Sequence, residues 1–171
     1  MGKVTFSVLI VAASRSDLSV MEESRKTLDS FGVSSRVVIV SAHRDPDRVR
    51  ALAKKARDNG VGVIIAGAGM SAALAGVMAS YATIPVIGIP LFSEPFGALD
   101  SLLSSIQMPR GVPVAVVSAG PTGAVNAAVL AAEILSIRDR SLEAKLLSYR
   151  KALTSQAGPG TKQNGQVDKG R

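Results

Sequence analysis

Cysteine is absent from this chain of 171 residues, which excludes disulfides, a thiol nucleophile and thiolate metal sites. Tryptophan is absent too, and aromatic residues make up only 4% of the chain. Histidine occurs once, at His43, so a metal site with several imidazole ligands is also excluded, although carboxylates could still hold magnesium. Hydrophobic residues make up 47% of the chain. Because so few of them are aromatic, the interior must be filled by Ala, Val, Ile, Leu and Gly.

Two long segments without charge, 59–93 and 111–132, are long enough to be mistaken for membrane spans. Both are interrupted by glycine and proline, and strands that are buried on both faces of a parallel sheet also read as continuous apolar runs. We therefore expect a soluble protein with no membrane partner. No export signal is evident, which predicts a cytoplasmic location.

The formal net charge of +7 raises the question of nucleic-acid binding. The lysines and arginines are spread along the predicted helices, without interleaved aromatic residues or a recognisable reader motif. We expect no nucleic-acid partner. A basic surface of this kind favours a phosphorylated, anionic small molecule as the ligand.

Apolar segments alternate with amphipathic ones along the chain. The expected strands are Val4–Ala12, Arg36–Val40, Val61–Ala66, Pro85–Ile89 and Val112–Ser118, and the expected helices are Asp17–Phe31, Asp47–Asn59, Ser71–Tyr81, Ala98–Ile106, Thr122–Ile137 and Ser141–Leu153. This alternation predicts a three-layer, doubly wound α/β fold around a parallel sheet, flavodoxin-like or Rossmann-like. We expect one domain over residues 1–153. Residues 154–171 are rich in Gly, Gln, Ser and charge and are predicted to be a disordered tail.

The single histidine stands directly after a predicted strand. In open α/β sheets, ligands bind at the carboxyl ends of the strands. Histidine is the side chain that ordinarily titrates near neutral pH, so His43 is the candidate for proton transfer. A surface histidine without a role is the alternative interpretation of this residue taken alone.

Polar or glycine-rich loops follow three of the predicted strands and are expected to meet over one crevice. Their candidate ligand-binding residues are Ser14, Ser16 and Asp17 in the first loop, Ser41 and Arg44 beside His43 in the second, and Gly67, Ala68, Gly69, Met70 and Ser71 in the third. Hydroxyls, a guanidinium and the backbone N–H groups of a helix start can bind a phosphate. Asp17 can accept a hydrogen bond from an amine or a ribose hydroxyl.

Each loop also has a purely structural interpretation. The first could be only a helix N-cap, Arg44 could pair with Asp45 or Asp47, and the glycines could serve tight packing alone. The joint placement of these residues on consecutive loops favours a functional site.

Four stretches of the sequence resemble the class I N5-carboxyaminoimidazole ribonucleotide mutases, the PurE family, also called the catalytic subunit of phosphoribosylaminoimidazole carboxylase. These stretches are Ser14-x-Ser16-Asp17, Ser41-Ala42-His43-Arg44-x-Pro46, Ile64–Gly69 continuing to Pro85–Gly88, and Leu99–Leu102 with Gln107-Met108-Pro109-x-Gly111 and Asn126–Ala128. The resemblance covers most of the chain, from about Val8 to Leu135.

The resemblance implies a specific reaction in purine (IMP) biosynthesis. A carboxylate moves from the exocyclic nitrogen of a ribonucleotide to carbon 4 of its imidazole ring, without a cofactor or a metal. It implies that His43 is the general acid and base, that Ser14, Asp17 and Arg44 hold the ribose phosphate, and that the loop at 67–71 faces the carboxylate. It further implies a homo-octamer in which the last helix packs on a neighbouring subunit, and a functional partnership with the synthetase that makes the N5-carboxy substrate.

The third loop departs from the family pattern. Met70 replaces the usual second glycine, Ala73 replaces a second histidine and Ala75 replaces a proline, while Ala12-Ala13 stands where Met-Gly is usual. Two enzymatic alternatives therefore stay open: direct carboxylation of aminoimidazole ribonucleotide by CO2, and the carboxylation of a nicotinate precursor by a related group with a similar Gly-Met loop. A non-catalytic nucleotide-binding paralogue is the third alternative.

Overall fold

The computed structural model of the chain describes residues 7–156. The strands are β1 (Val8–Ala12), β2 (Ser35–Ile39), β3 (Val63–Ala68), β4 (Val86–Pro90) and β5 (Ala115–Val116). The helices are α1 (Leu18–Ser30), α2 (Pro46–Ala56), α3 (Ala73–Tyr81), α4 (Leu99–Ile106), α5 (Gly120–Ser136) and α6 (Arg140–Gln156).

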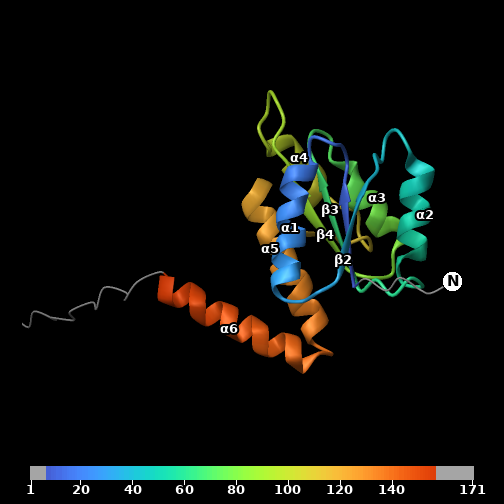
Figure 1. Ribbon diagram of the computed structural model, residues 1–171. Coiled ribbons are helices and arrows are strands. Elements are labelled where there is room, and N and C mark those ends of the chain that lie inside the picture. Colours follow the sequence, from blue (N-terminus) through green and yellow to red (C-terminus); the bar gives the residue numbers. More distant parts are fainter. Residues whose placement is uncertain (1–6, 157–171) are drawn as a thin grey trace, which may run out of the picture.

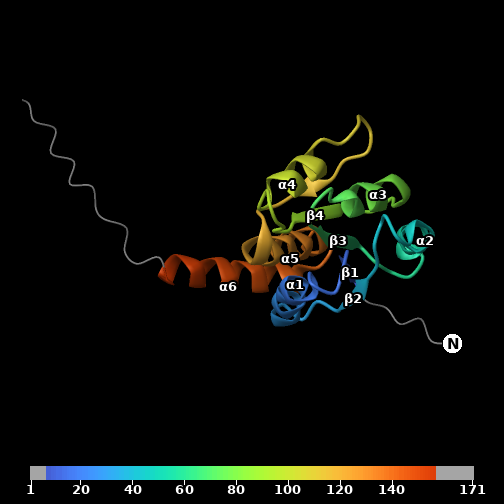
Figure 2. The same cartoon turned by 90° about the horizontal axis from the view of Figure 1, so that it is seen from above.

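The strands form one parallel sheet in the order β2-β1-β3-β4-β5. Helices α1 and α5 cover one face of this sheet, and α2, α3 and α4 cover the other (Figures 1 and 2). The three-layer, doubly wound fold expected from the sequence is thereby confirmed, with the flavodoxin-like strand order. The chain changes direction across the sheet between β1 and β3, which is where such folds bind ligands.

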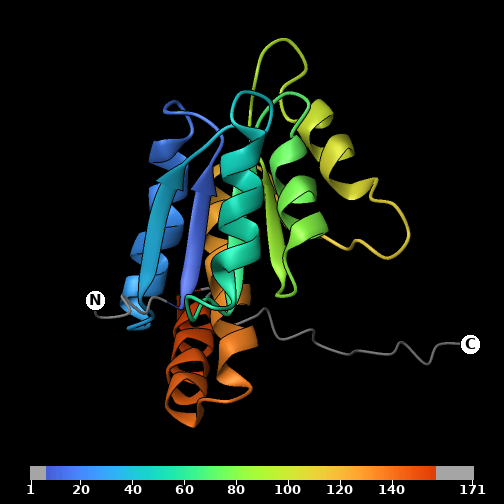
Figure 3. The ribbon, with the colours of Figure 1, turned by 90° about the vertical axis from the view of Figure 1, so that its right-hand side faces the viewer.

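Strand β1 supplies both layers of the core. Val8 and Ile10 belong to the cluster that packs against α1 and α5, whereas Leu9 and Val11 belong to the cluster under α2 and α3. All five residues of β1 are buried, as expected for a central parallel strand whose successive side chains point to opposite faces. Both faces of the sheet are thus covered, and the loops that follow the strands leave it at its carboxyl edge (Figure 3).

Several predicted boundaries differ from those observed. The strand expected at Val112–Ser118 contains only the two residues of β5, because β5 is an edge strand with one neighbour and Pro113 before it has no N–H to donate. Strand β3 begins at Val63 rather than Val61, since the N–H of Val61 donates instead to the carbonyl of Ala56 and closes the end of α2. Residues 4–6 of the first predicted strand lie outside the described residues.

Helix α6 begins as part of the domain and then leaves it. Leu142 and Leu146 are buried in the core, and Tyr149 packs edge-on against Phe31 with ring centroids 5.3 Å apart. The second half of the helix projects away from the other elements (Figure 1). It continues to Gln156, so the first three residues of the predicted tail are helical, and the rest of that tail lies outside the described residues.

The start of α6 is fixed by Asp139. Its Oδ1 accepts hydrogen bonds from the Ser141 hydroxyl at 2.7 Å and from the backbone N–H groups of Ser141 and Leu142 at 2.9 and 3.2 Å. The hydrogen bond from the Ser141 hydroxyl, and to a lesser degree that from the Leu142 N–H, holds the pKa of this carboxyl below its usual range.

Within residues 7–156, no helix is both long and apolar enough to span a membrane.

Candidate functional site

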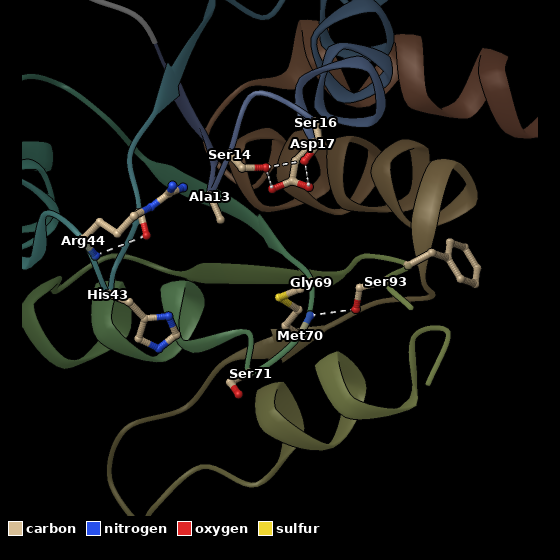
Figure 4. A pocket seen from close by; sticks show the side chains of 12 residues that line it. Ala13, Ser14, Ser16, Asp17, His43, Arg44, Gly69, Met70, Ser71 and Ser93 are labelled. Carbon is tan, nitrogen blue, oxygen red and sulfur yellow. Dashed lines mark hydrogen bonds between the residues drawn. The ribbon is translucent and has the colours of Figure 1, made fainter. Parts of the chain in front are cut away.

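A cavity of about 520 Å³ opens at the carboxyl edge of the sheet, over the place where β1 and β3 lie side by side (Figure 4). Four connections reach it: β1–α1, β2–α2, β3–α3 and β4–α4. The residues that line it are Ala13, Ser14, Ser16, Asp17, Ser41, His43, Arg44, Gly69, Met70, Ser71, Phe92 and Ser93. Nine of the residues proposed from the sequence, including His43, therefore lie around one cavity.

The β1–α1 connection contributes a network of hydroxyl and carboxylate groups. The Ser14 hydroxyl donates to Asp17 Oδ2 at 2.8 Å, and the two serine hydroxyl oxygens, of Ser14 and Ser16, lie 2.6 Å apart. Asp17 is the N-cap residue of α1, but its carboxylate makes no capping hydrogen bond to the helix. The helix-cap interpretation of this loop therefore does not account for the side chain, which faces the cavity instead (Figure 4).

The β2–α2 connection presents the histidine and an arginine. The backbone N–H of Arg44 donates to the Ser41 hydroxyl at 3.3 Å, which folds the loop back on itself. Asp45 then caps α2 by accepting from the N–H of Arg48 at 3.2 Å, and Pro46 begins the helix.

Arg44 forms no ion pair with Asp45 or Asp47, the two partners that a purely structural role would give it. The side chains of His43 and Arg44 are exposed, and neither makes a hydrogen bond or ion pair with any residue in the described part of the chain. Both side chains are therefore available to a ligand.

The β3–α3 connection forms the opposite wall. Met70 has a φ of 55° and its N–H donates to the Ser93 hydroxyl at 3.0 Å. Helix α3 consequently begins at Ala73, two residues later than predicted. The thioether of Met70 points into the cavity (Figure 4).

Two of the proposed residues, Gly67 and Ala68, do not line this cavity. Both are buried residues of β3. A Cβ on Gly67 would lie 2.3 Å from the Met21 sulfur, so this glycine serves the packing of α1 on the sheet. Ala68 lines a much smaller neighbouring hollow of about 40 Å³ that also touches His43.

Three lining residues were missed from the sequence: Ala13, Phe92 and Ser93. The last two follow β4, which is the next strand in the sheet after β3. The rule that polar loops after parallel strands meet at one edge applies to this connection too, and the polar residue Ser93 could have pointed to it. The role of Ser93 becomes visible only in the structure, through its hydrogen bond to Met70.

The cavity combines groups that suit an anion with a group that can move a proton. Arg44, the serine hydroxyls and the start of α1 suit a phosphate, and Asp17 suits a hydroxyl or amine. His43 is the group suited to general acid–base chemistry. Within residues 7–156, no three His, Cys, Asp or Glu side chains are grouped so that they could hold a metal ion.

The chain is similar in sequence to a family of known proteins. Residues 7–156 match the AIR carboxylase family. The chain is 46% identical over 151 residues to the N5-carboxyaminoimidazole ribonucleotide mutase of Brucella melitensis, an alignment that covers 88% of this chain and 93% of the relative. It is 50% identical over 141 residues to the mutase of the same name from Pyrococcus abyssi, covering 82% and 80% of the two chains.

Solved structures show the same architecture. The crystal structure of Treponema denticola PurE superimposes with a TM-score of 0.79 at 30% identity, covering 88% of this chain and 92% of that one. The family match covers residues 7–156, and each of these relatives and this structure covers more than four fifths of the chain. The chain therefore belongs to the AIR carboxylase family.

Proposed function

We propose that this protein converts N5-carboxyaminoimidazole ribonucleotide to 4-carboxy-5-aminoimidazole ribonucleotide, an isomerisation in purine biosynthesis. The observation that carries the proposal is the gathering of His43, Arg44 and Asp17 around one cavity in a chain of this family. The mutases of Brucella melitensis and Pyrococcus abyssi support the choice of this reaction.

The ribose phosphate and the imidazole ring of the substrate would bind to different walls of the cavity. Ser14, Asp17 and Arg44 hold the ribose and its phosphate, since together they offer hydroxyls, a carboxylate and a guanidinium. Ser16 extends the hydroxyl network, and Ser41 shapes the histidine loop. Gly69, Met70 and Ser71 face the imidazole end of the substrate together with His43, and Ala68 supports this wall from the neighbouring hollow.

One acid–base group is sufficient for the reaction because its proton balance is zero. Cleavage of the N–CO2 bond releases CO2 and requires a proton on the exocyclic nitrogen, which protonated His43 donates. Carbon 4 of the ring then attacks the CO2 carbon, forming the new C–C bond. Neutral His43 removes the proton that carbon 4 loses, so the histidine is restored to its starting state. Once the bound substrate displaces water from the site, the CO2 stays beside the ring.

Turnover measured by ultraviolet absorbance tests the proposal. Freshly made N5-carboxyaminoimidazole ribonucleotide at low bicarbonate is compared with aminoimidazole ribonucleotide supplied with bicarbonate. We expect rapid conversion of the first substrate and slow conversion of the second.

The other outcomes of this experiment separate the alternatives. Conversion of only the aminoimidazole ribonucleotide would identify a direct carboxylase. Failure to convert either compound, by protein that is folded by circular dichroism, would contradict the proposed activity and favour a non-catalytic paralogue or a different substrate.

A homo-octamer is the assembly that we propose. Supporting it, an apolar surface formed by α4 and the segment before it is exposed in the single chain: Phe92 and Phe96 are each 67% exposed, Leu99 is 59%, and Leu103 and Ile106 are each 48% exposed. Contiguous exposed apolar residues of this kind usually mark an interface. The projecting half of α6, with Leu147 and Leu153 exposed, suits packing on a neighbouring subunit.

The molar mass in solution tests this assembly. Light scattering coupled to size exclusion is expected to give eight times the 17.6 kDa chain mass. A Leu103→Glu substitution, which places a charge in the apolar surface, is expected to lower that mass. A wild-type protein that elutes as a monomer at micromolar concentration would contradict the octamer.

The substrate's chemistry suggests where the protein works. A phosphorylated ribonucleotide does not cross membranes, so we propose that the reaction takes place in the cytoplasm, in the same compartment as the enzyme that makes the substrate. The N5-carboxy group is a carbamate, so a functional partnership with the synthetase that forms it would limit its loss. Faster overall flux from the two enzymes mixed than from separated steps would support this partnership, and equal flux would contradict it.

A further inference from the structure

Met70 is the one residue other than glycine with a positive φ in the part of the chain that the structure describes. At a φ of 55° a side chain crowds its own backbone, and glycine would adopt the same conformation without that penalty. The Met70 side chain is also 64% exposed, so burial in the core does not compensate for the strained conformation. Strained backbone of this kind concentrates at functional sites.

The strained conformation is held from the neighbouring connection. Ser93 accepts a hydrogen bond from the Met70 N–H at 3.0 Å and directs its own hydroxyl toward Asp100 Oδ2 at 3.4 Å. Asp100 is fixed in turn, because its Oδ1 accepts from the N–H of Ser101 at 2.8 Å. This chain of hydrogen bonds therefore holds the Met70 backbone in its positive-φ conformation.

Few of the residues that line the cavity have apolar side chains. Its lining consists mainly of serine, charged and glycine residues, with only Ala13, Met70 and Phe92 apolar. The Phe92 ring packs over Gly120 at the start of α5, 2.4 Å from the position of an ideal Cβ there, and it is otherwise 67% exposed. Met70 is a long, flexible apolar side chain whose thioether extends into the cavity, where it can cover the flat face of a ligand ring (Figure 4).

We infer that Met70 is a specificity-determining residue, whose thioether packs on the face of the imidazole ring of the substrate. Sulfur–aromatic contacts are favourable, and the unbranched side chain can adjust to the ring. The inference rests on the proposed function for the identity of the ring. It assigns a ring-binding role to a residue that makes no contact with the ribose phosphate, which the polar groups on the opposite wall recognise.

Two probes and three variants test the inference. Binding of aminoimidazole ribonucleotide and of ribose 5-phosphate, which lacks the ring, is measured by calorimetry for wild type and for M70A, M70L and M70G. We expect M70A to bind the ribonucleotide roughly two- to tenfold more weakly and ribose 5-phosphate unchanged. M70L, which keeps the apolar volume, should lose less affinity for the ribonucleotide than M70A.

The glycine variant separates the side chain from the backbone. M70G should bind the ribonucleotide as weakly as M70A but melt at a higher temperature than M70A, because glycine adopts the positive φ without strain. This comparison also shows that both variants are folded.

The failures are distinguishable. If wild type binds the ribonucleotide and M70A binds it equally well, the ring contact is overturned while the proposed function stands. Equal weakening of both probes in M70A would also overturn it, since the residue would then act through the shape of the loop. If wild type binds ribose 5-phosphate but not the ribonucleotide, the proposed function itself fails.

Discussion

Replacing His43 with asparagine is expected to lower kcat for the carboxylate transfer by roughly two to four orders of magnitude, with a much smaller change in KM. Asparagine is similar in size and can still donate a hydrogen bond, but it cannot take and return a proton at neutral pH. Because His43 is the chain's one histidine, no second imidazole can substitute for it. The measurement is steady-state turnover of fresh N5-carboxyaminoimidazole ribonucleotide.

The fold should survive this substitution. The His43 side chain is exposed, and its replacement breaks no side-chain hydrogen bond or ion pair with the residues described. Asp47→Asn is a suitable control, since Asp47 is exposed on the first turn of α2 and does not line the cavity. In an H43A variant, imidazole added to the buffer should restore part of the rate. Full turnover by H43N would contradict the acid–base assignment.

Gly123→Ala is expected to lower the free energy of unfolding by about 3 kcal/mol. A Cβ at Gly123 would lie 1.7 Å from the backbone carbonyl oxygen of Ser118 and 3.1 Å from Ile89 Cγ2. A carbonyl oxygen at the start of α5 cannot move aside as a flexible side chain can. The substitution therefore forces the segment at Ser118 away from the first turn of α5, and it also tightens the contact of α5 with Ile89 of β4.

Gly76→Ala is the matched control for this experiment. Gly76 is also a helical glycine, in α3, but its nearest neighbour is the Met108 side chain, with the sulfur 3.0 Å from the ideal Cβ. Met108 can adjust, and alanine gains up to about 1 kcal/mol of helix propensity over glycine, so little net change is expected. Urea unfolding followed by circular dichroism compares the two variants. A G123A protein as stable as G76A would show that the start of α5 can shift at no cost.

The fold class was accessible from the sequence because burial on both faces makes the central strands nearly pure apolar runs. β1 and β4 are buried at every position, and their predicted carboxyl ends agree with the structure within one residue. β5 was overestimated because an apolar run does not reveal that its strand lies at the edge of the sheet. The order of strands in the sheet depends on contacts between residues that are distant in sequence. The hydrophobic periodicity of single segments does not predict those contacts.

The site was predictable to the extent that it follows from topology. Loops after parallel strands meet at one edge, which was enough to bring Asp17, His43 and Ser71 together. Gly67 was indistinguishable from the loop glycine Gly69 in the sequence, since only the packing of Met21 shows that it faces the core. Ser93 was missed because its importance depends on the left-handed backbone of Met70, which nothing in the residue type of methionine predicts.

The hydrogen bonds around the cavity also determine how its walls can change. Those of Ser14 with Asp17 and of Ser41 with Arg44 stay within their own loops. The bond from Met70 to Ser93 joins two loops. At their bases the loops are tied to the sheet, since the Ala13 N–H donates to the Gly67 carbonyl and the Leu91 N–H donates to that of Ala68. Beyond those ties, and among the residues described, a substitution at Ser93 is expected to reach Met70 on the next wall, whereas one at Ser41 is expected to change its own loop alone.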